Sequence, residues 1–210
     1  MSTGGEGFAA ALSRFAAAAP QWASALAYAA VWVSPGSLPS GLARILALGM
    51  VVEFLLIHSF PFLFVLGAGD DKGRDRWRRS AGLVAMGSIY LLFAGALSVA
   101  FHSTAPLWTF GWLIASRVTA IWLGSAPRAT DVASQMGGWG RSAALYIFGA
   151  IGTAILPVPP LGLTTAAAAA IALPGSGTWV ESPQKLYAFG FLYFAASAWL
   201  SARAAKRLSS

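Results

Sequence analysis

The chain has 210 residues, of which 57% are hydrophobic and only 10% are charged. Soluble domains carry about 25% charged residues, so this shortage predicts that lipid surrounds much of the chain. The absence of cysteine excludes disulfides, thiolate nucleophiles and cysteine-ligated metal sites. The net charge of +7 could reflect a nucleic-acid partner or the orientation of the chain in a membrane, and the placement of the basic residues distinguishes the two.

Six apolar segments are long enough, or nearly so, to cross a hydrocarbon core of about 30 Å, which takes about 20 helical residues. They cover residues 15–33, 45–67, 81–101, 107–123, 142–173 and 186–202. We therefore expect an all-α integral membrane protein, a single domain over residues 1–210 built as a bundle of six transmembrane helices.

The first segment has some features of a secretory signal. Arg14 precedes its apolar stretch, and Ala-Leu-Ala-Tyr-Ala is loosely like a cleavage site. The leader, however, is long, contains Glu6 and has a single positive charge. We therefore expect a first helix that is retained.

The basic residues predict the orientation of the bundle. If the loop around residues 70–79 is cytoplasmic, eleven of the 14 basic residues lie in cytoplasmic segments, Arg117 lies within a span, and only Arg44 and Lys185 lie on the outer side. This bias matches the positive-inside rule, so both termini are expected in the cytoplasm and no nucleic acid is needed to explain the charge. Clustered basic residues beside a membrane attract anionic headgroups. The expected lipid-headgroup contacts are Lys72, Arg74, Arg76, Arg78 and Arg79.

Tryptophans are expected where the helices meet the headgroups, because an apolar ring with a polar N–H suits that zone. Near the inner ends these are Trp77, Trp122 and Trp139. Near the outer ends they are Trp32, Trp108, Trp112 and Trp179.

The fifth segment is too long for one upright crossing, since residues 142–173 would span about 48 Å as a helix. Pro157, Pro159 and Pro160 interrupt it, because proline lacks the backbone donor and clashes with the preceding turn. Two short spans or a re-entrant hairpin are alternatives, but either would place the basic C-terminal tail outside. We expect one tilted crossing that is broken between Pro157 and Pro160.

Three ionisable residues fall inside the predicted spans: Glu53 and His58 in the second and Arg117 in the fourth. An unpaired charge in hydrocarbon costs at least about 2.5–3.5 kcal/mol, so such residues face protein or water and have partners. We expect Glu53 and His58 to face inward toward Arg117, as an ion pair of Glu53 with Arg117 and an interhelical hydrogen bond from His58. The alternative is a proton or ion relay through the same three residues.

Cofactor binding and catalysis find little support in the sequence. A haem or pigment ligated by His58 needs a small residue one turn earlier, and Phe54 stands there. His102 is expected at one membrane face, too far away to complete a bis-histidine site. No nucleophile motif, His-rich box or aspartate pair is present, so we predict no catalytic residue, no metal and no cofactor.

These features predict a non-catalytic multi-pass protein of a bacterial cytoplasmic (inner) membrane, acting as a subunit or accessory of a larger membrane complex. Its expected partners are the lipid bilayer and either other membrane subunits or a second copy of the chain. The alternative is a small ion or proton channel, or a proton-coupled transporter, that uses Glu53, His58 and Arg117. A transporter with a broken helix normally has a second, related half, and no repeat is found in the sequence.

Overall fold

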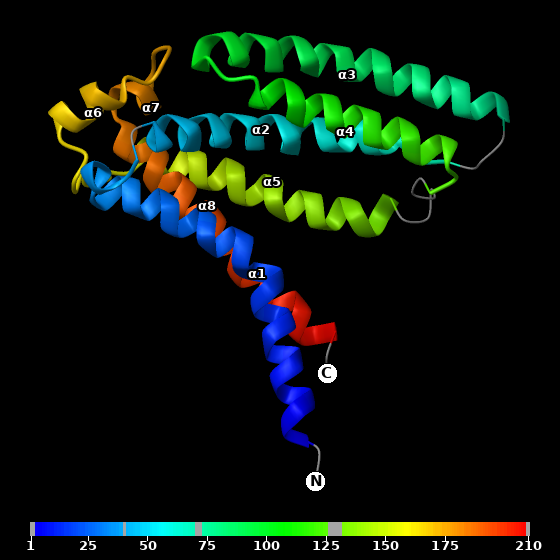
Figure 1. Cartoon of the computed structure of the whole chain (residues 1–210), viewed down its shortest axis with the longest axis horizontal. Coiled ribbons are helices and arrows are strands. Elements are labelled where there is room, and N and C mark those ends of the chain that lie inside the picture. Colours follow the sequence, from blue (N-terminus) through cyan, green and yellow to red (C-terminus); the bar gives the residue numbers. More distant parts are fainter. Residues whose placement is uncertain (1–2, 40, 70–72, 126–131, 209–210) are drawn as a thin grey trace. The chain divides into compact units, whose positions relative to one another are not determined.

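The computed structural model describes residues 3–39, 41–69, 73–125 and 132–208. Every regular element within these ranges is a helix, as the all-α prediction requires (Figure 1). The elements are α1 (Thr3–Val33), η1 (Pro35–Ser37), α2 (Leu42–Gly67), α3 (Gly73–Phe101), α4 (Ala105–Trp122), α5 (Val132–Ile155), α6 (Thr165–Ile171), α7 (Thr178–Glu181) and α8 (Pro183–Leu208).

The chain divides into two compact units. The terminal unit comprises Met1–Ala47 and Leu145–Ser210, and the central unit comprises Leu48–Ala144. The two boundaries between the units therefore fall inside α2 and α5. A single domain over residues 1–210 stays a prediction.

The pair α1 and α8 forms the spine of the terminal unit, where the two helices lie side by side (Figure 1). Gly190 of α8 faces the ring of Tyr28, and a Cβ atom at position 190 would lie 2.3 Å from Tyr28 Cδ1. Tyr28 also stacks on Phe194, with ring centroids 5.5 Å apart. At Gly149 of α5, a Cβ atom would lie 2.8 Å from Phe189 Cε2. Glycine thus makes room for a large ring on the facing helix, which is how helices approach closely in lipid.

Two tyrosine hydroxyls join this spine to the start of α2. Tyr28 Oη donates to the Leu46 carbonyl at 2.6 Å, and Tyr187 Oη donates to the Ala43 carbonyl at 2.9 Å. Both rings are buried, so each hydroxyl needs a partner inside the fold. A second lone pair on each helical carbonyl oxygen provides it.

The central unit packs α2 against the hairpin of α3 and α4. Gly87 of α3 allows close contact with α4, because a Cβ atom there would lie 2.5 Å from Ile114 Cδ1. The hairpin turns at His102, which has φ of 51°. Two clusters of buried side chains join the three helices: Leu55, Tyr90, Ala94 and Phe110 in one, and Leu63, Leu83 and Ile121 in the other.

Pro61 lies inside α2 and leaves a gap in the backbone hydrogen bonding of that helix. Proline has no backbone N–H, so the carbonyl of Ile57, four residues earlier, lacks its usual donor in the helix. Trp139 of α5 fills the gap, because its Nε1–H donates to the Ile57 carbonyl at 2.7 Å. The structure therefore places the Trp139 indole against the middle of α2. The sequence had instead predicted Trp139 near the inner membrane surface.

The predicted fifth span differs from the helix that forms. α5 begins at Val132, ten residues before the predicted start, and ends at Ile155. Its 24 residues extend about 36 Å, which is enough to cross a membrane without a second half. Pro157, Pro159 and Pro160 lie after the helix, and helix resumes only as the seven residues of α6. The single broken crossing is thus corrected to a complete helix followed by a proline-rich connector.

The connector packs against the end of α1. Trp32 Nε1–H donates to the Pro159 carbonyl at 2.8 Å, and the Gly162 N–H donates to the Trp32 carbonyl at 3.2 Å. Only glycine fits at position 162, because a Cβ atom there would lie 2.1 Å from the Val33 carbonyl oxygen. These contacts hold an irregular segment to a helix end.

Lys185 completes the end of α5. Its Nζ donates to the Ala154 carbonyl at 2.6 Å, one of the last four carbonyls of α5, which have no donor within the helix. A cation at a helix C-terminus also favours the helix dipole. Lys185, one of the two basic residues predicted on the outer side of the membrane, therefore has a structural role.

Two helical segments in the described ranges, Leu42–Gly67 and Asp75–Phe101, are long and apolar enough to cross a membrane. They correspond to the second and third predicted spans. The first, fourth and sixth predicted spans and the first part of the fifth lie in helices of the described ranges, but those helices do not meet the same criterion of length and hydropathy.

We expect Trp139→Phe to lower the free energy of unfolding by at least about 1 kcal/mol, because the donor to Ile57 is lost together with the five-membered ring of the indole. Circular dichroism of unfolding in detergent micelles measures the change. The control is the same substitution in a Pro61→Ala background, where the restored N–H at position 61 bonds Ile57 and the Trp139 bond becomes redundant. An equal loss in both backgrounds would contradict this account.

We expect Gly190→Ala to destabilise the protein by about 1–3 kcal/mol, because the added methyl group overlaps the ring of Tyr28. Gly152→Ala is the matched control, since nothing lies within 4 Å of a Cβ atom there. The control is expected to stabilise α5 by up to about 1 kcal/mol through helix propensity. Thermal unfolding of both variants in one detergent compares them, and similar unfolding temperatures would rule out the close contact.

Candidate functional site

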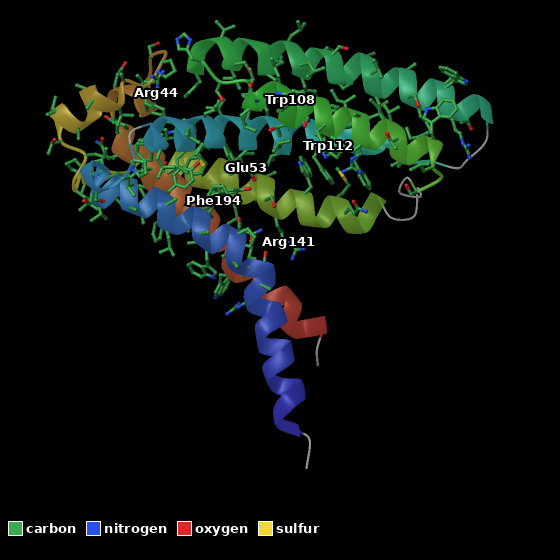
Figure 2. All side chains as sticks on the ribbon, in the orientation of Figure 1. Arg44, Glu53, Trp108, Trp112, Arg141 and Phe194 are labelled. Atoms are coloured by element: carbon green, nitrogen blue, oxygen red, sulfur yellow. The ribbon has the colours of Figure 1, made fainter. Side chains whose placement is uncertain are left out.

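The candidate site lies in the central unit, where α2 carries Glu53 and His58 and α4 carries Arg117. Glu53 is half-buried on α2, and Figure 2 labels it there. His58 follows five residues later and is exposed. Arg117 is half-buried on α4. The expectation that His58 points into the bundle is therefore not what the structure shows.

His58 lies in an aromatic ladder, which we define as Phe54, His58 and Phe62 of α2 with Tyr90 of α3. Phe54 stacks nearly parallel to the imidazole, with centroids 5.9 Å apart and planes 8° apart. Phe62 and Tyr90 meet the imidazole edge-on at 5.7 and 6.1 Å. The i, i+4 spacing of the α2 members places them on one helix face. The ladder presents an imidazole outward between two exposed phenylalanine rings.

The imidazole of His58 makes no hydrogen bond to any part of the chain that the structure describes. Its contacts are with aromatic rings, which give neither ring nitrogen a polar partner. The parallel ring of Phe54 stands one turn before His58, as the spacing in the sequence indicated. Among the described residues, no group of three or more His, Asp or Glu side chains gathers to hold a metal.

Arg117 joins α4 to α2 through an aromatic ring. Its guanidinium carbon lies 5.8 Å from the centroid of the Phe64 ring, within the range of a cation–π contact. Phe64 is 1% exposed, so the charge sits against a buried ring. Arg117 thus links α4 to α2 through Phe64, whereas the sequence predicted an ion pair with Glu53.

The basic residues at the start of α3, predicted to contact headgroups, do not all have the same surroundings. Lys72 lies outside the described residues, as does the side chain of Arg74. Arg79 donates through Nη2 to the Gly67 carbonyl at the end of α2, so it caps that helix. Arg78 is exposed and Arg76 is half-buried. Contact of Arg76 and Arg78 with headgroups stays a prediction, and Arg79 has a structural partner of its own.

Trp77 and Trp122, both predicted near the inner membrane surface, meet edge to face at 5.2 Å. They come from the start of α3 and the end of α4, and both are exposed. The pair marks one end of the α3–α4 hairpin.

A pocket in the terminal unit was missed by the sequence reasoning. Its volume is about 250 Å³, and it lies between the end of α1, the loop that follows, the start of α2, and α6. Among the described residues that line it, Arg44 is the one that carries a charge. The available signal was the position of Arg44 as one of two basic residues predicted on the outer side.

No known protein family, curated protein or solved structure matches this chain.

The contact of Arg117 with Phe64 predicts a coupling that differs from that of an ion pair. In a double-mutant cycle, Arg117→Met and Phe64→Leu should couple by about 0.5–1 kcal/mol. The matched cycle pairs Arg117→Met with Glu53→Gln and should show a smaller coupling. Unfolding in detergent gives all the free energies. A larger coupling of Arg117 to Glu53 than to Phe64 would contradict this account and support the ion pair predicted from the sequence.

Proposed function

We propose that the protein is a non-catalytic, multi-pass membrane protein that works as a subunit or accessory of a larger membrane assembly. The apolar windows of the two candidate spans are only 33% and 28% buried. A core helix of a soluble protein would be mostly buried, whereas a helix in lipid exposes its apolar side chains. The low burial therefore supports a hydrocarbon surrounding for α2 and α3.

Exposed large side chains extend this surface over the central unit. Leu92 and Val99 of α3 are 76% and 75% exposed, and Trp108 of α4 is 76% exposed. A soluble monomer rarely exposes contiguous apolar patches larger than a few hundred Å². Other large apolar side chains exposed on these helices are Phe54, Phe62, Val65, Val84, Ile89, Phe93, Leu107 and Trp112.

We further propose that α1, α4, α5 and α8 complete a bundle of six crossings with both termini in the cytoplasm. The 18 residues of α4, the shortest of them, extend about 27 Å, close to the thickness of the hydrocarbon core. The bias of basic residues supports the orientation and a bacterial cytoplasmic membrane. Fusing reporters within residues 70–72 and 126–131 tests it, because both stretches are expected on the cytoplasmic side.

His58 is the observation that carries the assembly proposal. It lies nine residues, or about 13 Å, from the end of α2, so a membrane-spanning α2 holds it within the hydrocarbon. An exposed imidazole has no polar partner in lipid, and burying polar groups unpaired is unfavourable by several kcal/mol. A neighbouring protein helix that offers a donor or acceptor removes this penalty. The aromatic ladder supplies the flat apolar surface on which such a helix packs.

The assembly is tested by native mass spectrometry of the protein extracted gently from its own membrane. We expect other membrane polypeptides, or a second copy of the chain, to accompany it. His58→Leu removes the polar group and keeps an apolar side chain. The loss of one interhelical hydrogen bond, worth about 1–2 kcal/mol, should weaken the association about 5–30-fold.

The matched control is His102→Asn at the turn of the α3–α4 hairpin, where asparagine tolerates the positive φ. This variant should bind its partner like the parent. Purification of the parent as a monomer without other polypeptides would contradict the assembly proposal.

A small ion or proton channel, or a proton-coupled transporter, is the second candidate. The half-buried Glu53 and Arg117 within apolar helices favour it, since intramembrane ionisable residues mark ion pathways. In liposomes, such a protein should carry a flux that Glu53→Gln or His58→Ala changes. A flux that is absent, or unaffected by either substitution, would remove this candidate.

A further inference from the structure

The pocket of the terminal unit combines an apolar lining with one cation. Val31, Leu38 and Ile171 line it, together with Ala167 and Ala170 of α6. The alanines leave the volume open, because larger side chains at these positions would fill it. Arg44 enters from the first turn of α2, and Figure 2 shows it at that end of the helix, on the same side as α6.

Arg44 has no partner within the described part of the chain: no ion pair, hydrogen bond or ring contact reaches its guanidinium. The terminal unit contains only two carboxylates in its sequence, Glu6 and Glu181. Glu181 accepts from the Gly177 N–H at 3.4 Å, and the side chain of Glu6 lies outside the described residues. The other basic residue predicted outside, Lys185, is bonded to Ala154. Among the described residues, Arg44 is therefore a basic residue of the predicted outer side whose guanidinium has no partner.

The position and size of the pocket indicate its occupant. Arg44 precedes the apolar part of α2 by one residue, which places it at the level of the headgroups if α2 crosses the membrane. Guanidinium groups suit phosphate, because their planar donors match two of its oxygens. Pockets that enclose whole drug-sized ligands measure about 300–1,000 Å³. A volume of about 250 Å³ instead fits a headgroup or a few carbons of a chain whose remainder stays in the bilayer.

We propose that this pocket binds an anionic phospholipid of the outer leaflet, with its phosphate on Arg44 and the start of an acyl chain against α6. The charges are complementary, and the apolar lining accepts the hydrocarbon beside the phosphate. The inference rests on the membrane insertion proposed above, but not on assembly with other subunits. It concerns the terminal unit alone.

The experiment uses the full chain reconstituted in vesicles of equal parts phosphatidylglycerol and phosphatidylcholine. After mild detergent extraction, native mass spectrometry counts each lipid retained per chain. The parent should retain phosphatidylglycerol in preference to phosphatidylcholine. Arg44→Gln should lower this ratio about tenfold, because the guanidinium charge that favours a net anionic headgroup over a zwitterionic one is lost. Ala167→Leu should lower total retention, since it fills the pocket and leaves the charge in place.

Two controls match these variants. Arg141→Gln removes an exposed positive charge from the central unit, and Ala169→Leu enlarges an exposed alanine of α6 that does not line the pocket. Both should retain lipid like the parent. An unchanged ratio in Arg44→Gln, or an equal fall in Arg141→Gln, would overturn the proposal.

Two further outcomes separate the sources of failure. Displacement of the retained lipid by millimolar inorganic phosphate would overturn the assignment to a lipid and point to a free anion. A chain that does not float with the vesicles overturns the membrane proposal and this inference together. A chain that floats but shows no preference between the lipids overturns this inference alone.

Discussion

The bond from Trp139 to the Ile57 carbonyl shows the constraint on which much of the structure depends: a backbone carbonyl without its helical donor needs another one. Pro61 removes the donor inside α2, and an indole from α5 replaces it. In water the solvent would satisfy this carbonyl at little cost. In the hydrocarbon proposed for α2, only another part of the protein can.

The same solution recurs where helices end. Lys185 donates to a carbonyl in the last turn of α5, and Arg79 donates to the last residue of α2. Trp32 donates to Pro159 in the connector. Long side chains with nitrogen donors thus bond backbone carbonyls at these four places. Several basic or tryptophan residues that suggest membrane topology in the sequence therefore also have a structural role.

His58 and Arg44 differ from these residues, because neither forms a hydrogen bond with the described part of the chain. The unbonded imidazole of His58 supports the proposed interface with a neighbouring helix. The unbonded guanidinium of Arg44 supports the proposed lipid in its pocket.

Several features could be predicted from the sequence, because they depend on local composition. The all-helical fold, the long apolar helices α2 and α3, the hairpin turn at His102 and the loss of helix at Pro157 follow from apolar run lengths and from proline chemistry. The site could be predicted only in part. A tie between α2 and α4 through Arg117 was expected, but the partner was taken to be Glu53, because opposite charges are the natural pair when the neighbouring rings are unknown. The structure brings Phe64 to Arg117 and turns His58 outward.

The amino-acid sequence was enough to predict an all-helical chain and to identify residues that cannot remain unpaired in an apolar surrounding, since both are properties of single residues and their near neighbours. It did not predict where each helix begins and ends, as α5 shows. Which groups meet depends on the packing of the helices. Trp139 and Ile57 are 82 positions apart. Glycine is needed at position 190 only because the ring of Tyr28, on another helix, packs against it. The pocket at Arg44 likewise exists because α6, more than a hundred residues along the chain, presents alanines to the start of α2. Such contacts depend on helix rotation and packing, which local spacing along one chain does not encode.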